Sequence, residues 1–493
     1  MNDDIIFIIT IDFFDRYGYT EDMKRLLLFV TVLLICAAVT SCDENKITEV
    51  PKTEQNQANT VTEVVVDTDS MKKNAVDALN SINSVDLGGK NFTVASTSGM
   101  VYVPESKDTN YKVAIDERNR MFEKKCSAHL LQFNDNEDIM LRTARLNMLS
   151  GVYYTDLFSI PQNDLGKFAA QGILLRTSTL VGADFSKPWY DPAMMEQAAY
   201  SSENYGIYGD FNRDIANYYC LYVNRDLLTS AGLKMPYDKV KNGSWTWDEL
   251  IAMLRANAEI NGTAALSSSN MGLLTKAVYK SGGNNFVDTG KGKEPVLAFN
   301  NERTAGVMSL LRRIGGYKTL YNENAESGSA GSDFMQGKSL FYIGTVGEMK
   351  TITTMSSDWC ILPLPKTIAS NDTYYSYVSP DHAVIAVYAG SHCSDMTQVI
   401  DALYASSTGG YLSDAYYYEL IDTAIRDSSA LDMMDYICGI KGGKPVNDFT
   451  DIYTQYQPYA ENAVAKAMYN YDLTPEAIYR SVVDGFEKNK NIN

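Results

Sequence analysis

One segment in the middle of the chain, from Tyr218 to Leu250, limits the possible folds more than any other part of the sequence. Its first part, Tyr219 to Val223, is a short run of apolar and aromatic residues that is typical of a β-strand. Arg225 to Ala231 is predicted to form a short helix that ends at a glycine, the usual residue just past a helix terminus. Thr246 and Glu249 then have the spacing of a capping box, which predicts the start of a second helix. A strand followed closely by two capped helices indicates an α/β architecture.

Further along the sequence, and before this segment, predicted strands and helices alternate in the same way. The strands expected in the N-terminal half are residues 91–96, 129–133 and 152–158, and the helices are residues 114–125 and 137–149. This alternation predicts a sheet with mainly parallel strands and helices on both faces, whose ligands bind at the strand ends. A chain of 493 residues exceeds the size at which one core keeps growing, so we expect two globular bodies.

Composition excludes some classes of partner and favours another. The formal net charge of −18 argues against nucleic acid and anionic lipid head groups, which would be repelled. The chain also carries 34 tyrosines. A tyrosine offers an apolar ring face and a hydroxyl, which suits ligands such as sugars, although most of these side chains are expected to fill cores and surfaces.

The N-terminal region has the pattern of a bacterial lipoprotein signal. Met23 is followed by two basic residues, an apolar run to Val39, and then Thr-Ser-Cys42. The last four residues resemble a lipobox, so we expect Cys42 to be lipidated and residues 1–22 to be an over-long extension of the signal peptide at 23–42. An uncleaved membrane anchor is the alternative. Residues 43–86 are expected to be a flexible tether with a leading helix.

No residue pattern for catalysis, metal binding or cofactor binding is visible. The three histidines, His129, His382 and His392, do not have metal-ligand spacing, and no phosphate-binding or dinucleotide-binding motif occurs. We therefore expect no catalytic residue, no metal and no cofactor. Of the seven cysteines, five follow the signal region, and free buried thiols are favoured, with one disulfide still possible.

Several short motifs, in a fixed order, resemble family 1 extracellular solute-binding proteins of ABC importers. The matching stretches are Tyr222–Arg225, Gly232–Leu233 and Thr246–Leu250, with Asp116–Asn119, Tyr154–Leu157, Lys167–Leu175, Asp184–Asp191, Ser332–Tyr342 and Asp358–Pro365 in support. The resemblance implies a two-lobed, type II periplasmic-binding-protein-like α/β fold with strands that cross a hinge. It also implies a monomeric, non-enzymatic protein at the outer face of the cytoplasmic membrane, which passes a small solute to importer permease subunits.

By the same resemblance, the chain should cross between the lobes more than once. We expect lobe one to comprise residues 87–208 and 381–438, and lobe two to comprise residues 209–380 and 439–493. The solute would lie between the lobes, which close on it by a hinge motion. Aromatic side chains near the crossings favour a mono- or oligosaccharide, while a peptide, a polyamine or a metal chelate stays open. A lipid-anchored glycan hydrolase and a non-transport sugar-sensing or adhesive protein are the alternative functions.

Residues near the crossings are the expected ligand contacts. The candidates are Trp189, Tyr190, Tyr208, Asp210, Asn212, Tyr342, Tyr377 and Asp381. Ser96 and Asn134, at the ends of the first two predicted strands, are weaker candidates. Trp247 is expected to pack beneath its helix cap instead.

Overall fold

The computed structural model describes residues 68–200, 203–261, 266–268, 271–285, 287–288, 296–297, 302–315, 330–368, 373–423, 428–439, 443–447, 472–474, 477–478, 480–481 and 483–485. The chain divides into two units, residues 1–60 and 61–493, and every described residue belongs to the second. The predicted extension, signal peptide and Cys42, and a helix expected near residues 460–470, lie outside the described residues. Across the described ranges, no helix combines the length and the apolar character needed to cross a membrane.

The first sheet contains five strands in the order β2-β1-β3-β12-β4. Its strands are β1 (Lys90–Ser96), β2 (Ala128–Asn134), β3 (Leu157–Pro161), β4 (Gly206–Ile207) and β12 (Ala383–Val387). β1 is parallel to β2 and β3, whereas β12 inserts antiparallel between β3 and β4. β12 has the sequence AVIAV and is buried along its whole length, as expected of a strand covered on both faces.

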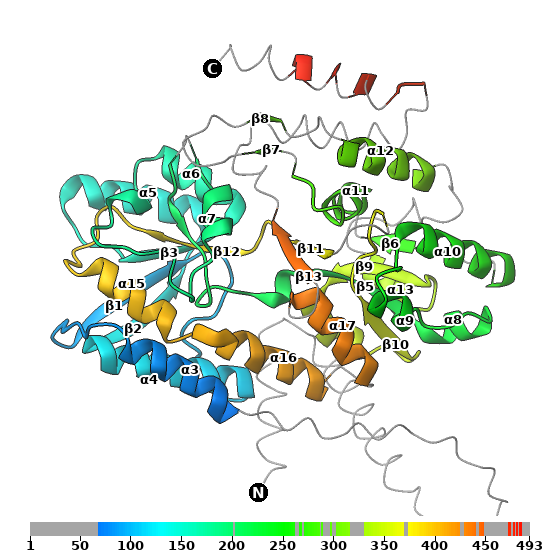
Figure 1. Ribbon diagram of the computed structural model, residues 1–493. Helices are drawn as coiled ribbons and strands as arrows, with labels where there is room; N and C mark the ends of the chain where they lie inside the picture. The colour runs from blue at the N-terminus through cyan, green and yellow to red at the C-terminus, as the bar shows by residue number, and fades with distance from the viewer. Residues whose placement is uncertain are drawn as a thin grey trace, which may run out of the picture. The chain divides into compact units, whose positions relative to one another are not determined.

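Helices cover both faces of this sheet, and Figure 1 shows α5 and α6 on one side with α4 and α15 on the other. The helices of this lobe are α3 (Thr68–Asn80), α4 (Asn110–Cys126), α5 (Glu137–Ser150), α6 (Leu165–Ala170), α7 (Pro192–Gln197) and α15 (Met396–Ala405). α5 begins because the Asn136 side chain accepts a hydrogen bond from Asp138 N, and it ends at Gly151, whose φ of 70° is left-handed.

The motif at Asp116–Asn119 has a structural role in α4. Arg118 is fully buried, and both its Nη2 and Asn119 Nδ2 donate to the carbonyl of Tyr102, at 3.1 Å and 2.9 Å. The guanidinium also lies 4.6 Å from the ring centroid of Phe211. Burial lowers the pKa of Arg118 to about 10, so the side chain remains charged at neutral pH. The motif therefore ties the loop after β1 to the segment after β4.

The second sheet has four strands in the order β10-β5-β9-β6. They are β5 (Tyr219–Asn224), β6 (Leu266–Ser268), β9 (Phe341–Thr345) and β10 (Trp359–Leu362). The helices that follow or surround them are α8 (Arg225–Ser230), α9 (Tyr237–Lys241), α10 (Trp247–Asn261), α11 (Met271–Lys280), α12 (Glu302–Gly315), α13 (Ala330–Met335), α14 (Met349–Ile352) and α17 (Ser428–Cys438). Two small ladders complete the described strands, β11 (Tyr374–Val378) with β13 (Gly443–Asn447), and β7 (Val287–Asp288) with β8 (Val296–Leu297). Short 3-10 helices are η1 (Gln162–Asp164), η2 (Thr177–Thr179), η3 (Ile215–Asn217), η4 (Val346–Glu348) and η5 (Thr408–Gly410).

The segment from Tyr218 to Leu250 folds largely as its sequence predicts, into β5, α8, α9 and the start of α10. The predicted capping box is only half formed. Thr246 Oγ1 accepts from Glu249 N at 3.4 Å, but the Glu249 carboxylate pairs with Lys239 instead of reaching back. Trp247 is fully buried, and its Nε1 donates to Ser281 Oγ at 2.9 Å, which confirms the expected packing role.

The third strand of the first sheet is displaced from its expected position. We expected residues 152–158, whereas β3 begins at Leu157. The preceding residues act as a side-chain cap on β1, because Asp156 Oδ2 accepts from Thr93 N at 2.9 Å and Thr155 Oγ1 donates to Thr93 O at 3.0 Å. These side chains occupy the backbone groups that an earlier start of β3 would need. The expected free thiols are confirmed for Cys126, Cys220, Cys360, Cys393 and Cys438.

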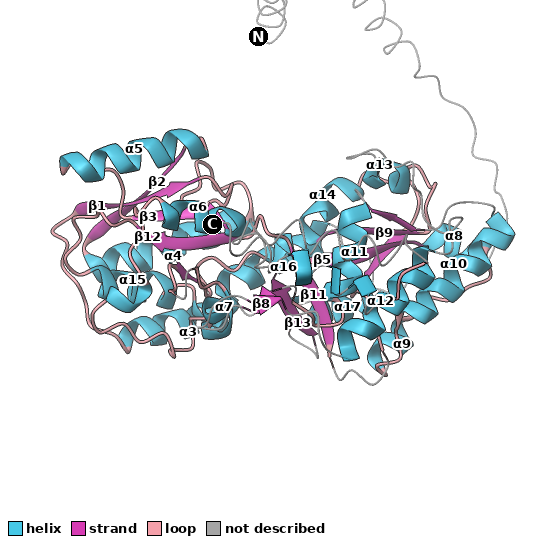
Figure 2. Ribbon diagram, turned by 90° about the horizontal axis from the view of Figure 1, so that it is seen from above, coloured by secondary structure: helices cyan, strands magenta, loops and turns pink. Residues whose placement is uncertain are grey.

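Within the residues that the structure describes, three connections join the two lobes. The first connection is residues 208–218, between β4 and β5, and the second is residues 379–382, between β11 and β12. The third is α16 (Tyr411–Thr423), which leads from α15 to α17 and lies between the two sheets in Figure 2. α17, which we expected in lobe one, contacts β10 and α9. The lobe boundaries themselves stay predictions.

Glu419 on α16 links the two lobes through its carboxylate. Oε1 accepts from Lys350 Nζ of α14 at 2.6 Å, and Oε2 accepts from Tyr111 N of α4 at 3.2 Å. Burial by itself raises the pKa of Glu419, but hydrogen bonds from Lys350 and Thr109 outweigh it, so the pKa lies below its ordinary value of 4.5.

This lowered pKa predicts a pH-dependent contribution to stability. A carboxylate with a lowered folded pKa stabilises the fold above its unfolded pKa and loses that contribution as pH falls through the folded value. Glu419→Gln should therefore lower the free energy of unfolding by about 1–3 kcal/mol at pH 7, the range for hydrogen bonds to charged groups. Denaturant unfolding should show this difference shrinking below pH 4.5. A difference that is constant from pH 3 to pH 7 would contradict the role assigned to the carboxylate.

Candidate functional site

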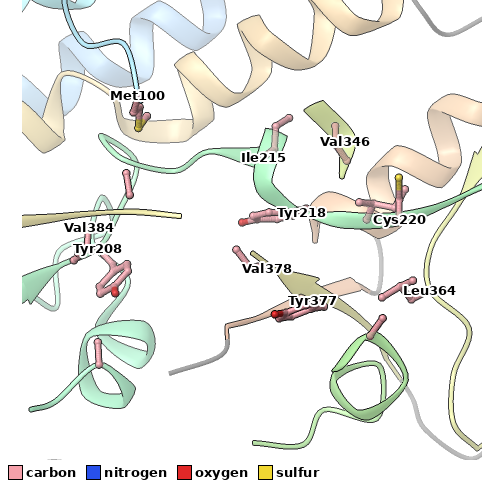
Figure 3. Close-up of a cluster of buried hydrophobic side chains, with 14 of the residues drawn as sticks. Met100, Tyr208, Ile215, Tyr218, Cys220, Val346, Leu364, Tyr377, Val378 and Val384 are labelled. Carbon is pink, nitrogen blue, oxygen red and sulfur yellow. The ribbon is translucent and has the colours of Figure 1, made fainter. Parts of the chain in front are cut away.

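The first and second connections lie side by side between the two sheets. Tyr218 and Val378 form an antiparallel bridge, and Ser379 N donates to Asn217 O at 2.9 Å. Figure 3 shows Tyr218 and Val378 next to each other, with Tyr208 and Val384 on the side of the first lobe and Cys220 and Val346 on the side of the second. Side chains that leave these connections are therefore placed where the lobes meet.

Five residues at this meeting point form a group that we call the junction cluster, namely Tyr219, Glu348, Tyr377, Ser379 and Asp381. The rings of Tyr219 and Tyr377 are stacked, with centroids 4.9 Å apart and an interplanar angle of 11°. Burial raises the pKa of Tyr219 to about 12; Ser379 opposes this shift, while the carboxylates of Glu348 and Asp381 add to it. The phenol thus stays protonated at neutral pH and can act as a hydrogen-bond donor.

The Glu348 carboxylate is held by residues of the second lobe. Tyr342 Oη donates to Glu348 Oε2 at 2.5 Å, and Thr345 N donates to Oε1 at 3.3 Å. Thr345 and Glu348 form a complete capping box around η4, which explains why the carboxylate turns back toward the end of β9. Burial raises the pKa of the Tyr342 hydroxyl, and the nearby Glu348 raises it further, so Tyr342 acts as a fixed donor.

The first lobe contributes a second acidic group close to Asp381. Asp164 lies at the end of β3 and has its pKa raised by burial and by the carboxylates of Glu137 and Asp381, against the effect of Lys167. Lys167 Nζ lies 3.0 Å from Glu137 Oε1 and 3.2 Å from Asp164 Oδ1. Asp381 is exposed, and its Oδ2 accepts a hydrogen bond from Ser379 Oγ at 3.4 Å. The backbone next to both acidic groups is joined as well, because Asn163 N donates to Pro380 O at 3.4 Å.

The structure places three of the eight candidate ligand residues at this junction. Tyr377 and Asp381 belong to the cluster, and Tyr342 supports Glu348. Sequence reasoning missed Tyr219, Glu348, Ser379 and Asp164. The spacing of Thr345 and Glu348 was a readable signal, because a threonine followed three residues later by glutamate is a capping box. For the others, only the pairing of the two connections brings the side chains together.

Trp189, Tyr190 and Asp210 lie elsewhere in the first lobe. Trp189 is 4% exposed and lines a large open pocket together with Asp210. Tyr190 Oη donates to Asp401 Oδ1 at 2.7 Å. Burial raises the pKa of Asp210, although Arg213 and the backbone of Gly409 oppose the shift. Among the described residues, no side-chain interaction joins any of these three residues to the junction cluster.

Tyr208 and Asn212 are buried at the start of the first connection. Asn212 Nδ2 donates to Ile207 O at 3.2 Å and to Ala383 O at 2.9 Å, and its Oδ1 accepts from Gly209 N and Tyr404 Oη. Tyr208 is fully buried, and its ring stacks on His382 with centroids 6.2 Å apart. Burial lowers the pKa of His382 to about 4, and Arg213 lowers it further. Both side chains thus help to link β4, β12 and α15 where the connections meet the first lobe.

The two weaker candidates lie at strand ends of the first sheet. Ser96 is buried, with its Oγ 3.2 Å from Ser98 Oγ, and Asn134 Oδ1 accepts from Gln132 Nε2 at 3.0 Å. Over the part of the chain that the structure describes, no group of three His, Cys, Asp or Glu side chains is placed to hold a metal ion. The junction can offer ring faces, hydroxyl donors and carboxylate acceptors, which are the groups needed for non-covalent binding of a polar molecule.

Comparison with solved structures gives proteins of the same fold. The GacH receptor of Streptomyces glaucescens, solved unliganded and with acarbose, aligns with a TM-score of 0.52 and 14% identity over 81% of this chain and 98% of its own. A cyclic α-maltosyl-1,6-maltose binding protein from Arthrobacter globiformis gives 0.55 and 14% over 82% and 100%. An ABC substrate-binding protein from Listeria monocytogenes, in complex with cycloalternan, gives 0.50 and 13% over 82% and 99%. These likenesses confirm the expected two-lobed, type II periplasmic-binding-protein-like fold.

Sequence comparison supports the same assignment at the level of the family. A search of curated proteins found no match. The family profile of the bacterial extracellular solute-binding proteins, however, matches residues 104–386, which cover more than half of the chain and include the whole second sheet and, apart from β1, most of the first. The match extends from the loop before α4 to the end of β12 and so includes the first and second connections. The chain therefore belongs to the bacterial extracellular solute-binding protein family.

Proposed function

We propose that this protein captures a carbohydrate between its two lobes and delivers it to an ABC importer. The observation that supports this most is the junction cluster, which combines a stacked tyrosine pair with carboxylates of the second lobe and of the second connection. Three structural neighbours described above were solved with, or are named for, oligosaccharide ligands. Their ligands make a carbohydrate the first choice among the polar solutes that such a cluster suits.

The proposed binding step needs no covalent chemistry. The half-buried ring of Tyr219, which stacks on the fully buried ring of Tyr377, would pack against the C–H face of a sugar ring. Asp381 and Glu348 would accept hydrogen bonds from hydroxyls. Asp164 and Lys167 stand on the first lobe and would reach the sugar when the lobes close around the connections. Binding that contacts both lobes favours the closed state, because only that state makes both sets of contacts.

Trp189, Tyr190, Tyr208, Asp210 and Asn212 stay predictions as ligand contacts. Their described interactions favour other roles, since Asn212 uses both donors and both acceptor sites of its amide within the protein. We therefore propose Tyr219, Glu348, Ser379 and Asp381 as the ligand-contacting set, with Tyr342 and the buried Tyr377 as positioning residues.

Calorimetric titration with a sugar panel tests the proposal. The panel should contain acarbose, cycloalternan and cyclic maltosyl-maltose, because these are the ligands of the structural neighbours, together with common disaccharides. We expect at least one to bind and to raise the melting temperature, since a ligand that binds only the folded state stabilises it. Chromatography of the same mixtures should show no products. Hydrolysis that disappears on Asp381→Asn or Glu348→Gln would instead assign a glycan hydrolase.

The lipid anchor and the importer complete the proposal. The lipobox-like series that ends at Cys42 supports tethering at the outer face of the cytoplasmic membrane, where a monomer could meet permease subunits. Intact-mass measurement of the mature protein checks this, because an acylated N-terminal Cys42 is expected. An unmodified Cys42 inside a longer mature chain would contradict the anchor without touching the proposed ligand site.

A further inference from the structure

A large open pocket lies in the first lobe, apart from the junction cluster. Its volume is about 1180 Å³, enough for a ligand of several rings, since pockets for small molecules commonly measure about 300–1000 Å³. Its walls come from α3, from α15 and from the loop at residues 181–189. α3 and α15 contact each other and run side by side in Figure 1. None of the five residues of the junction cluster lines this pocket.

The charged groups of the pocket are paired with one another. Lys187 Nζ forms an ion pair with Asp401, whose other oxygen accepts from Tyr190 Oη at 2.7 Å. Arg213 Nη2 lies 3.6 Å from Asp210 Oδ1, and Gly409 N donates to Asp210 Oδ2 at 3.1 Å. The two cations that line the pocket thus each face a carboxylate, and Asp77 adds one further negative charge. This balance disfavours an anionic ligand and leaves N–H donors available to neutral groups.

The remaining polar lining consists of amides and hydroxyls. Asn74, Asn83 and Gln398 offer both donors and acceptors, and Ser81 and Thr397 offer hydroxyls. They come from α3, the turn after it, and α15, so they face the space from two sides. Closely spaced donors and acceptors without net charge complement the hydroxyls of a carbohydrate.

An apolar strip completes the pocket and matches the other property of a sugar ring. Ile82, Val181, Pro188 and Trp189 line it, and Val181 is 90% exposed, the highest value among the exposed large hydrophobic residues that the structure describes. C–H faces of a sugar could cover this strip while its hydroxyls meet the amides.

We propose that this pocket is a second binding site, which takes a short neutral oligosaccharide independently of the junction between the lobes. The proposal rests on the pocket's volume, its paired charges, its amide and hydroxyl lining and its apolar strip, and does not depend on the proposed function. A peptide would need apolar subpockets for its side chains. The mixed lining suits this need less well than it suits the hydroxyls of a sugar.

Hydrogen exchange with mass spectrometry tests the second site. The probes are maltotriose, cellotriose and tri-N-acetylchitotriose, added to the mature chain that carries Tyr219→Ala and Asp381→Asn to weaken the junction site. We expect at least one probe to slow exchange several-fold in peptides that cover α3 and α15, because a bound ligand suppresses local opening. Ser81→Trp in the same background should remove this protection by filling the pocket, since the Ser81 side chain is exposed and its Oγ donates to Ala78 O in its own turn.

Asn80→Trp is the matched control, because Asn80 is the exposed neighbour of Ser81 and does not line the pocket. It should leave the protection of α3 and α15 intact. No protection of α3 and α15 with any of the three probes would overturn the second site, and so would equal protection in the Ser81→Trp and Asn80→Trp proteins. Protection that appears only at the junction of a protein without the two junction substitutions would support the proposed function and overturn this inference alone.

Discussion

Tyr219→Ala should weaken binding of the best sugar from the panel by about 10- to 100-fold, which corresponds to roughly 1.4–2.8 kcal/mol. This range is expected when an aromatic ring that packs against the ligand is lost, because both its apolar contact area and its contacts with other rings disappear. Tyr219 is the aromatic residue that stacks on Tyr377 and lies near both junction carboxylates. Calorimetric titration of the wild type and the variant measures the change directly.

Two further variants separate the possible causes of that loss. Tyr219→Phe keeps the ring but removes the hydroxyl, so it should retain most of the affinity if stacking dominates. Tyr205→Ala is the control for the loss of a partly exposed tyrosine. Tyr205 directly precedes β4, whereas the first connection leaves the other end of that strand. Its affinity should equal that of the wild type. A folded Tyr219→Ala protein with unchanged affinity would remove the tyrosine pair from the site.

Asn212→Ala should destabilise the fold by about 3 kcal/mol, with little effect on the affinity of the protein that remains folded. Its amide makes four hydrogen bonds in a fully buried position, to Ile207 O, Ala383 O, Gly209 N and Tyr404 Oη. Alanine would leave buried partners of these bonds unsatisfied, and each such group costs about 1–3 kcal/mol, partly offset by water or local relaxation. Thermal and denaturant unfolding of ligand-free protein measure the loss.

Asn242→Ala is the matched control for this prediction. The Asn242 side chain also accepts two hydrogen bonds, from Ser244 N and Ser244 Oγ, but it is exposed. Its loss should cost less than about 1 kcal/mol, because water replaces the missing partner. If Asn212→Ala were as stable as Asn242→Ala but bound sugar much more weakly, Asn212 would be a ligand contact, as its place on the first connection first suggested.

Local sequence signals were sufficient for most of the elements that carry these sites. The β5 strand, the helix ends at glycines and the start of α10 follow from short patterns whose causes are local, namely apolar runs and caps. β3 was misplaced because its start depends on a non-local contact, the bonds from Thr155 and Asp156 to Thr93. The Glu249 half of a predicted capping box failed for the same kind of reason, since Lys239 competes for the carboxylate.

The candidate site was harder to predict because it depends on how the connections pair. Tyr377 and Asp381 were found from their position near a crossing. Tyr219 and Glu348 were not predicted as site residues. The pairing of Tyr218 with Val378 and the position of η4 after β9 bring them to the junction, and neither is evident from the sequence around each residue. Trp189 and Asp210 lie close together, with Asp210 N donating to Trp189 O at 3.0 Å, but they line a pocket of the first lobe. A residue's position near a crossing in the sequence does not determine which way its side chain points.

Capture by lobe closure is the central claim, and small-angle X-ray scattering tests it most directly. The mature protein should be measured without ligand and at saturation with the tightest-binding sugar of the panel. Closure of two lobes about their connections should lower the radius of gyration on binding, and the decrease should follow the calorimetric saturation curve. In Tyr219→Ala the same decrease should require correspondingly more sugar. Saturated binding with an unchanged radius of gyration would contradict capture between the lobes.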